Sequence, residues 1–173
     1  SLGFGGIAFR AEYSTSHLLE CDFTDNEAGS RGGAIRLSSN NKSKGYSTFE
    51  RCLIARNKVK EGTGSAVCVQ HAQRTAIINS TIYGNIATSG GAVFANGKNN
   101  DYKNELLIIS CTLAGNEGDG QLQLAGVQNL KFINSIICGD NLATEEGDGN
   151  LLDDYAAVFG DATLTNGVLK PLA

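Results

Sequence analysis

Acidic, thiol and imidazole side chains are the groups in this sequence whose spacing could support catalysis or metal binding. Hydrolysis of a glycosidic bond needs two carboxyl groups roughly 5 to 10 Å apart, and zinc or redox sites commonly contain a C-x-x-C pair. The chain contains five Cys and two His but no C-x-x-C pair. We therefore expect no metal site built from Cys and His, and whether two carboxylates meet depends on how the fold arranges them.

An acidic stretch near the C-terminus offers a different chemistry. Residues 140–150 include Glu145, Glu146 and Asp148, and Asp153 and Asp154 follow them. Carboxylate oxygens are the hard ligands that Ca²⁺ prefers, although most acidic loops are simply solvated. We expect a solvated loop and keep a Ca²⁺ site as the alternative.

Residues 42–60 are locally basic in a chain whose net charge is −4. The cationic residues there are Lys42, Lys44, Arg51, Arg56, Lys58 and Lys60. Such a surface could attract an anionic glycan or a lipid headgroup, but we favour an ordinary solvated loop. The acidic overall balance disfavours a nucleic-acid partner, and the absence of an apolar run of about 18 residues predicts no transmembrane helix.

A repeat that runs through most of the chain must position these groups. Five segments of nine residues share the pattern apolar-x-x-Cys/Ser-x-apolar-x-x-Asn/Asp and recur every 24 to 31 residues, at 18–26, 49–57, 77–85, 108–116 and 132–140. A segment that begins with Gly alternates with them, at 5–9, 32–37, 64–69, 90–95 and, more weakly, 120–124. Each repeat therefore contains at least two short strands with alternating apolar residues.

The composition favours strands that stack. Gly accounts for 22 of the 173 residues and Pro for only one; Gly weakens helices by about 1 kcal/mol at each interior position, and each Pro would remove a donor from a sheet. Repeats this short cannot enclose a core singly. We therefore predict an all-β fold, a right-handed parallel β-helix of about five to six coils formed by residues 1–150, with residues 151–173 as a closing coil or C-terminal cap. Because the chain opens directly into a Gly-led segment, we also expect coils upstream of it.

Stacking predicts which columns of the repeat point inward. Two apolar columns would fill the interior: Leu18, Phe49, Ile77, Ile108 and Phe132, and Phe23, Ile54, Ile82, Leu113 and Ile137. Small residues lie between them: Cys21, Cys52, Ser80, Cys111 and Ser135. Cys21 and Cys52 would be close enough for a disulfide, but we favour buried free thiols that pack as small apolar groups.

The polar ends of the segments predict a structural ladder. We expect Asn26, Asn57, Asn85 and Asn116 to end strands in a left-handed backbone conformation and to bond to one another along the stack. Asp140 would break this column. The pairs Gly32–Gly33 and Gly90–Gly91 would let the chain enter the next strand at a tight corner.

The outward positions of the strand after each Cys or Ser bear on function. They read Asp22, Leu53, Thr81, Thr112 and Ile136, then Thr24, Ala55, Tyr83, Ala114 and Cys138, so only Asp22 is acidic. Leu19, Ile78, Ile109 and Ile133, interrupted by Glu50, form an apolar column. We expect a corner that brings this column into the core, and the alternative is an exposed stripe that binds a partner.

The repeat resembles that of the chlamydial polymorphic membrane proteins, which are surface autotransporters marked by GGA(I/V/L) and FxxN motifs. Residues 32–35 and 90–93 match the first motif and residues 23–26 match the second, while Ile or Leu replaces Phe before Asn57, Asn85 and Asn116. Residues 79–85 and 134–140 are similar to the wider group of bacterial right-handed β-helix repeat surface proteins, which includes lipoproteins of gut Bacteroidetes. The resemblance covers about residues 3 to 141 and implies an exported protein, at the cell surface, in the outer membrane or secreted.

We therefore predict a non-enzymatic, adhesin-like or glycan-binding module without catalytic residues or a cofactor. Its partner would be a surface glycan, a host surface or an outer-membrane protein, bound through the lateral face. One alternative is a fragment of a polysaccharide-active lyase or glycosidase whose catalytic coils lie elsewhere. Another is a structural accessory subunit or lipoprotein of an outer-membrane complex.

Overall fold

The computed structural model describes residues 8–39, 45–71, 73–96, 104–118, 121–125, 127–138 and 142–144. Within these ranges the protein is all-β and contains no helix. Asp140, the acidic residues of 145–150 and the predicted cap at 151–173 lie outside the described residues. No described segment is a helix long and apolar enough to cross a membrane.

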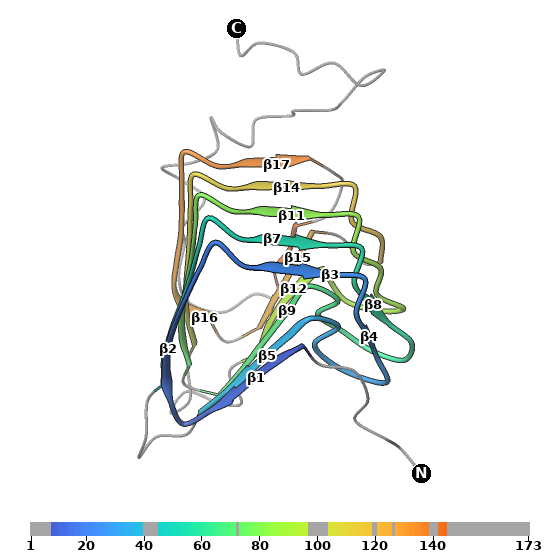
Figure 1. Cartoon of the computed structure of the whole chain (residues 1–173), viewed down its shortest axis with the longest axis horizontal. Coiled ribbons are helices and arrows are strands. Elements are labelled where there is room, and N and C mark those ends of the chain that lie inside the picture. The colour runs from blue at the N-terminus through green and yellow to red at the C-terminus, as the bar shows by residue number, and fades with distance from the viewer. Residues whose placement is uncertain are drawn as a thin grey trace, which may run out of the picture.

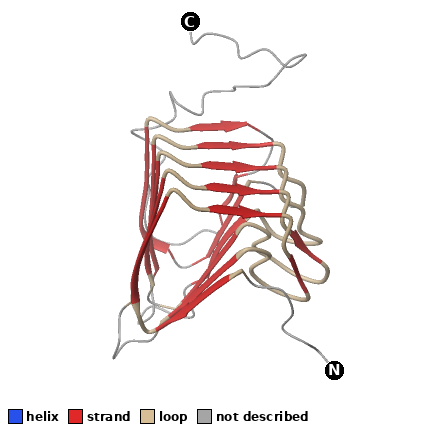
Figure 2. Ribbon diagram, in the orientation of Figure 1, coloured by secondary structure: helices blue, strands red, loops and turns tan. Residues whose placement is uncertain are grey.

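The strands form three parallel sheets that face one another (Figures 1 and 2). Sheet A contains β1 (Phe9–Glu12), β5 (Ile35–Ser38), β9 (Val67–Gln70), β12 (Val93–Asn96), β15 (Leu122–Ala125) and β18 (Leu142–Thr144). Sheet B contains β2 (Thr15–Leu19), β6 (Tyr46–Glu50), β10 (Arg74–Ile78), β13 (Asn104–Ile109) and β16 (Val127–Ile133). Sheet C contains β3 (Asp22–Thr24), β7 (Leu53–Ala55), β11 (Thr81–Tyr83), β14 (Thr112–Ala114) and β17 (Ile136–Cys138).

Each strand pairs with the equivalent strand of the next repeat, so residues at the same place in the pattern lie side by side. Ile54, for example, is in register with Phe23 on one side and with Ile82 on the other. The nine-residue segments span the end of a sheet B strand, a corner and a sheet C strand. A smaller parallel pair, β4 (Glu27–Ala28) with β8 (Lys58–Val59), continues as single bridges through Ile86 to Glu117.

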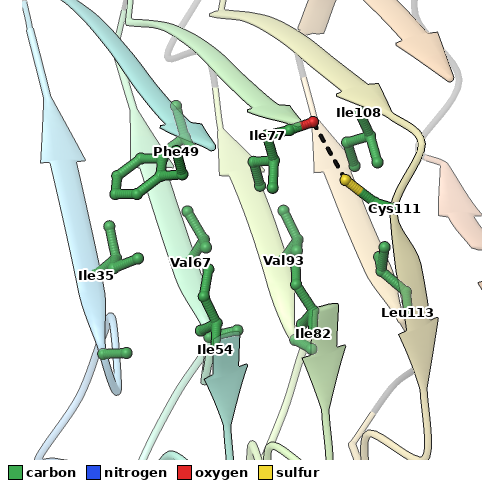
Figure 3. Close-up of a cluster of buried hydrophobic side chains, with 14 of the residues drawn as sticks. Ile35, Phe49, Ile54, Val67, Ile77, Ile82, Val93, Ile108, Cys111 and Leu113 are labelled. Atoms are coloured by element: carbon green, nitrogen blue, oxygen red, sulfur yellow. Dashed lines mark hydrogen bonds between the residues drawn. The ribbon is translucent and has the colours of Figure 1, made fainter. Parts of the chain in front are cut away.

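The inward side chains of all three sheets form one apolar core (Figure 3). Its buried members include Ile35, Val67 and Val93 of sheet A, Phe49, Ile77 and Ile108 of sheet B, and Ile54, Ile82 and Leu113 of sheet C. Full burial of such a side chain stabilises the fold by about 1.5–3 kcal/mol. A single repeat could not bury these side chains, because the repeats stacked on either side of it complete the core. The Phe49 ring also meets the rings of Phe9 and Phe23 edge-on, with centroids 6.1 and 6.2 Å apart. The arrangement fits a β-solenoid.

Residues with a left-handed backbone make the corners. The chain turns from sheet B to sheet C at Glu20, Arg51, Asn79, Ser110 and Asn134, whose φ angles lie between 48° and 54°. It leaves sheet C at Asp25, Arg56, Gly84 and Gly115, with φ between 55° and 62°. The prediction that the Asn column adopts this conformation is therefore wrong, because the residue before each Asn does so instead.

Candidate functional site

The Asn column is a hydrogen-bonded ladder buried beside the core. The Oδ1 atom of Asn57 accepts the backbone N–H of Asn26 at 3.0 Å and its Nδ2 at 2.8 Å. Asn57 and Asn85, and then Asn85 and Asn116, repeat the arrangement. The Nδ2 atoms of Asn57, Asn85 and Asn116 also donate to backbone carbonyls of the preceding repeat. These side chains satisfy the backbone where it leaves sheet C, which is a structural role.

The Cys and Ser column bridges the corner between sheets B and C in the same way. Cys111 donates from Sγ to the Ile77 carbonyl at 3.3 Å (Figure 3), and the Ser80 hydroxyl accepts the backbone N–H of Cys52 at 3.0 Å. Cys21, Cys52 and Cys111 are free thiols. Burial raises the pKa of the Cys52 and Cys111 thiols, which keeps them protonated. Their position therefore favours packing over reactivity.

The predicted Gly corners combine two constraints. Gly32 and Gly90 have φ of 67° and 73°, a conformation that L side chains rarely adopt. Gly33 lies outside that region, but a Cβ there would overlap the carbonyl oxygen of Ser65 in the next repeat. Gly91 is buried and accepts the backbone N–H of Gly64 at 3.1 Å. These glycines allow adjacent repeats to approach closely.

The outward face of sheet C does not bring two carboxylates together within the described strands. Asp22 is in register with Leu53, and Thr81, Thr112 and Ile136 continue the column. The second outward column contains Thr24, Ala55, Tyr83 and Ala114, followed by Cys138. Of this last residue only the backbone is described. Nor does any group of three or more His, Cys, Asp or Glu among the described residues suit a metal ion.

Three cations of the basic segment, Arg51, Arg56 and Lys60, pair with acidic residues of the preceding repeat. Arg51 binds Glu20 at 3.0 Å and Lys60 binds Glu27 at 2.6 Å. Arg56 forms a two-pronged pair with Asp25, from Nε at 2.8 Å and from Nη2 at 2.7 Å. Lys42 and Lys44 lie outside the described residues. The described part of this segment therefore gives little support to an anion-binding surface.

The apolar column at the end of sheet B faces outward, contrary to our expectation. Leu19 is 43% exposed, while Ile78, Ile109 and Ile133 are half-buried, and all four lie outside the core cluster. The strands keep their alternation up to the corner, so the residue after an inward Leu or Ile must point away from the interior. Ile136, at the start of sheet C, adds a side chain that is 39% exposed.

Sequence reasoning gave no role to the outward face of sheet A, which is partly covered. Cys68 and Phe94 are buried there, although neither belongs to the cluster of inward side chains between the sheets. A Cβ on Gly64 would lie 2.9 Å from that of Cys68, so the turn at Gly64 folds back over this strand. Burial raises the pKa of the Cys68 thiol to about 12, although the nearby positive charges of Arg36 and Arg31 act to lower it.

A strip beside sheet C, formed by Asp25, Arg56, Tyr83, Gly84 and Gly115, presents exposed polar and aromatic side chains. One column runs Asp25, Arg56, Gly84 and Gly115, because each residue directly follows a paired strand of sheet C. The Tyr83 side chain lies over Gly115, since a Cβ on that glycine would be 3.0 Å from Cε2 of the ring. Sequence reasoning placed Tyr83 on the outer face but missed this strip, although the glycines after Tyr83 and Ala114 were a visible signal.

Comparison of the chain with protein-family models, with curated protein sequences and with solved structures finds no match.

Proposed function

We propose that this protein is a non-enzymatic binding module of an exported bacterial surface protein and that it holds a glycan on its lateral face. The fold that we infer for it is a right-handed parallel β-helix of five to six coils, related to the GGA(I/V/L) and FxxN repeat proteins. Parallel crossovers of this kind are almost always right-handed, and sheet A already aligns strands of six successive repeats.

The observation that carries the proposal is the chemistry of the outward face of sheet C. Besides Asp22, the outward positions of its first four strands hold three Thr, the exposed Tyr83, Leu53 and two Ala, of which Ala55 is buried. Asp22 is the only carboxylate within these strands, and it is in register with Leu53. Such a surface offers hydrogen bonds and apolar contact to a polymer, whereas acid–base hydrolysis needs a second carboxylate nearby.

A screen against neutral and acidic polysaccharides tests this function. The purified protein should retard in gels that contain a polysaccharide it binds, and it should release no oligosaccharide from that polymer. Release that survives chelation and repeated purification would contradict the proposal and favour a lyase or glycosidase.

The outward apolar column favours a second candidate, a structural subunit of an outer-membrane complex. Leu19, Ile78, Ile109, Ile133 and Ile136 would then pack against another protein. Absence of both polysaccharide binding and product release in the screen would favour this function over the first.

A further inference from the structure

We infer that the strip containing Tyr83, Gly115 and the Asp25–Arg56 pair is a subsite for a neutral polysaccharide, an inference that rests on the proposed glycan-binding function. The side chains of Asp25 and Arg56 are 59% and 57% exposed, and Tyr83 as a whole residue is 54% exposed. They come from three successive repeats and lie at or just after the C-terminal ends of neighbouring sheet C strands.

The glycine positions make the strip shallow. Gly84 and Gly115 occupy the column in which the first two repeats carry Asp25 and Arg56. With no side chain at Gly84, a polymer could approach the backbone there, while at Gly115 the backbone is covered by the Tyr83 ring, which remains exposed. The nearest atom to a Cβ on Gly84 would be the Arg56 Cγ at 3.8 Å, so within the strip Arg56 lies next to this glycine.

Tyr83 provides the apolar contact that sugar recognition needs. Its ring lies over Gly115 and remains 54% exposed. The electron-rich face of an aromatic ring attracts C–H groups, and one face of a pyranose ring presents several of them. The phenolic hydroxyl can also exchange hydrogen bonds with sugar hydroxyls.

The charges of the strip favour a neutral ligand. Asp25 accepts two hydrogen bonds from the Arg56 guanidinium, and these bonds lower the pKa of the carboxyl group, so the pair stays ionised with no net charge. The remaining Nη1 of Arg56 makes no hydrogen bond to a described residue and can donate to a sugar hydroxyl. An anionic glycan would find no cation in the strip that a carboxylate does not already neutralise.

Tyr46 is a second exposed tyrosine, and its surroundings differ from those of Tyr83. It is 43% exposed on sheet B and lies beside an Arg–carboxylate pair, Arg74 with Glu105 at 3.1 Å. However, the next residue in its own column is the long Arg74, whereas the next residue in the column of Tyr83 is Ala114. A long side chain thus lies beside Tyr46 where Tyr83 has only the methyl group of Ala114, so Tyr46 is a matched control.

Affinity electrophoresis in gels containing galactomannan, xyloglucan or polygalacturonate tests the site. We expect the wild-type protein to be retarded by at least one of the two neutral polymers. Tyr83→Ala should weaken that retardation at least tenfold, Tyr83→Phe should largely preserve it, and Tyr46→Ala should leave it unchanged. Gly115→Asn, which suits the left-handed backbone but whose side chain would displace the Tyr83 ring, should also weaken it at least tenfold.

The outcomes separate the site from the function. Retardation of Tyr83→Ala equal to that of wild type would overturn the site and leave glycan binding in place. Retardation by polygalacturonate alone would overturn the neutral ligand class. No retardation of the wild-type protein by any of the three polymers would contradict the proposed function and the site together. The melting temperature of each variant checks that it is folded.

Discussion

The Oδ1 atom of Asn85 accepts both the backbone N–H and the side-chain Nδ2 of Asn57, each at 2.9 Å. One carboxamide oxygen thus satisfies two donors of the neighbouring repeat. Because the same residue donates its own Nδ2 to Asn116 and to the Ile54 carbonyl, Asn85 joins three successive repeats. Its position explains why the pattern demands Asn and not merely a polar residue.

Replacement of Asn85 by Ala should destabilise the protein by about 3 kcal/mol or more, because the buried amide of Asn57 loses its acceptor. Asn26→Ala is the matched control at the end of the ladder, where the backbone N–H keeps its bond to Asn57. It should cost about 1 kcal/mol. Urea denaturation measures both, and equal losses would show that the ladder adds nothing beyond local packing.

Two glycine substitutions separate close approach from backbone conformation. Gly33→Ala places a methyl group against the Ser65 carbonyl and should cost more than about 3 kcal/mol, because backbone must move. Gly84→Ala adds a methyl group at ordinary contact distance from Arg56 Cγ, 3.8 Å, at a φ of 62°, so it should cost only about 1–2 kcal/mol. Thermal or urea unfolding of the two variants gives the comparison, and a larger loss for Gly84→Ala would contradict the packing of adjacent repeats.

Ser should replace Cys111 with a loss below about 1 kcal/mol, because Ser135 makes the equivalent bonds in the next repeat. Cys68→Ser should cost roughly 1–3 kcal/mol, since no described residue hydrogen-bonds to this thiol and a hydroxyl would be buried there without a known partner. Chemical denaturation distinguishes the two variants. Similar losses at both sites would mean that the corner hydrogen bonds are not the reason for the Cys/Ser column.

The stability of the protein should fall as pH rises above about 9. The pKa of Cys68 is raised from 9.0 to about 12 in the folded protein, so its contribution is fully present below the unfolded pKa and is lost as pH rises toward the folded one. The slope from this thiol approaches about 1.4 kcal/mol per pH unit. Cys68→Ala should flatten the curve between pH 9 and 11, and an unchanged slope would contradict the burial of this thiol.

The Asp25–Arg56 pair should contribute stability that is lost in acid. Its hydrogen bonds lower the pKa of Asp25 below 3.8, so the contribution is present above that value and disappears as pH falls through the folded pKa. The difference in unfolding free energy between wild type and Arg56→Gln should therefore shrink below about pH 4 and in 1 M salt. A difference that is unchanged at low pH and in high salt would assign it to packing of the Arg56 side chain instead.

The sequence pattern was informative where one residue type recurs in one column. Ile54, Ile82 and Leu113 were predicted to point inward, and all three are fully buried. It was misleading at Leu19 and Ile109, because hydrophobicity alone does not say on which side of a corner a side chain lies. It also assigned the left-handed conformation to Asn57, when Arg56 adopts it and leaves the Asn side chain free to bond along the stack.

By itself, the sequence determined that short strands recur, that they stack in parallel and which columns fill the interior, because these follow from a periodic pattern of apolar, small and amide side chains. Only the tertiary structure decided that Arg56 pairs with Asp25 and that Tyr83 lies over Gly115. These contacts join residues about one repeat apart, and a column brings them together only once the register between repeats is set. The recognition surface therefore belongs to the stack and not to any one repeat.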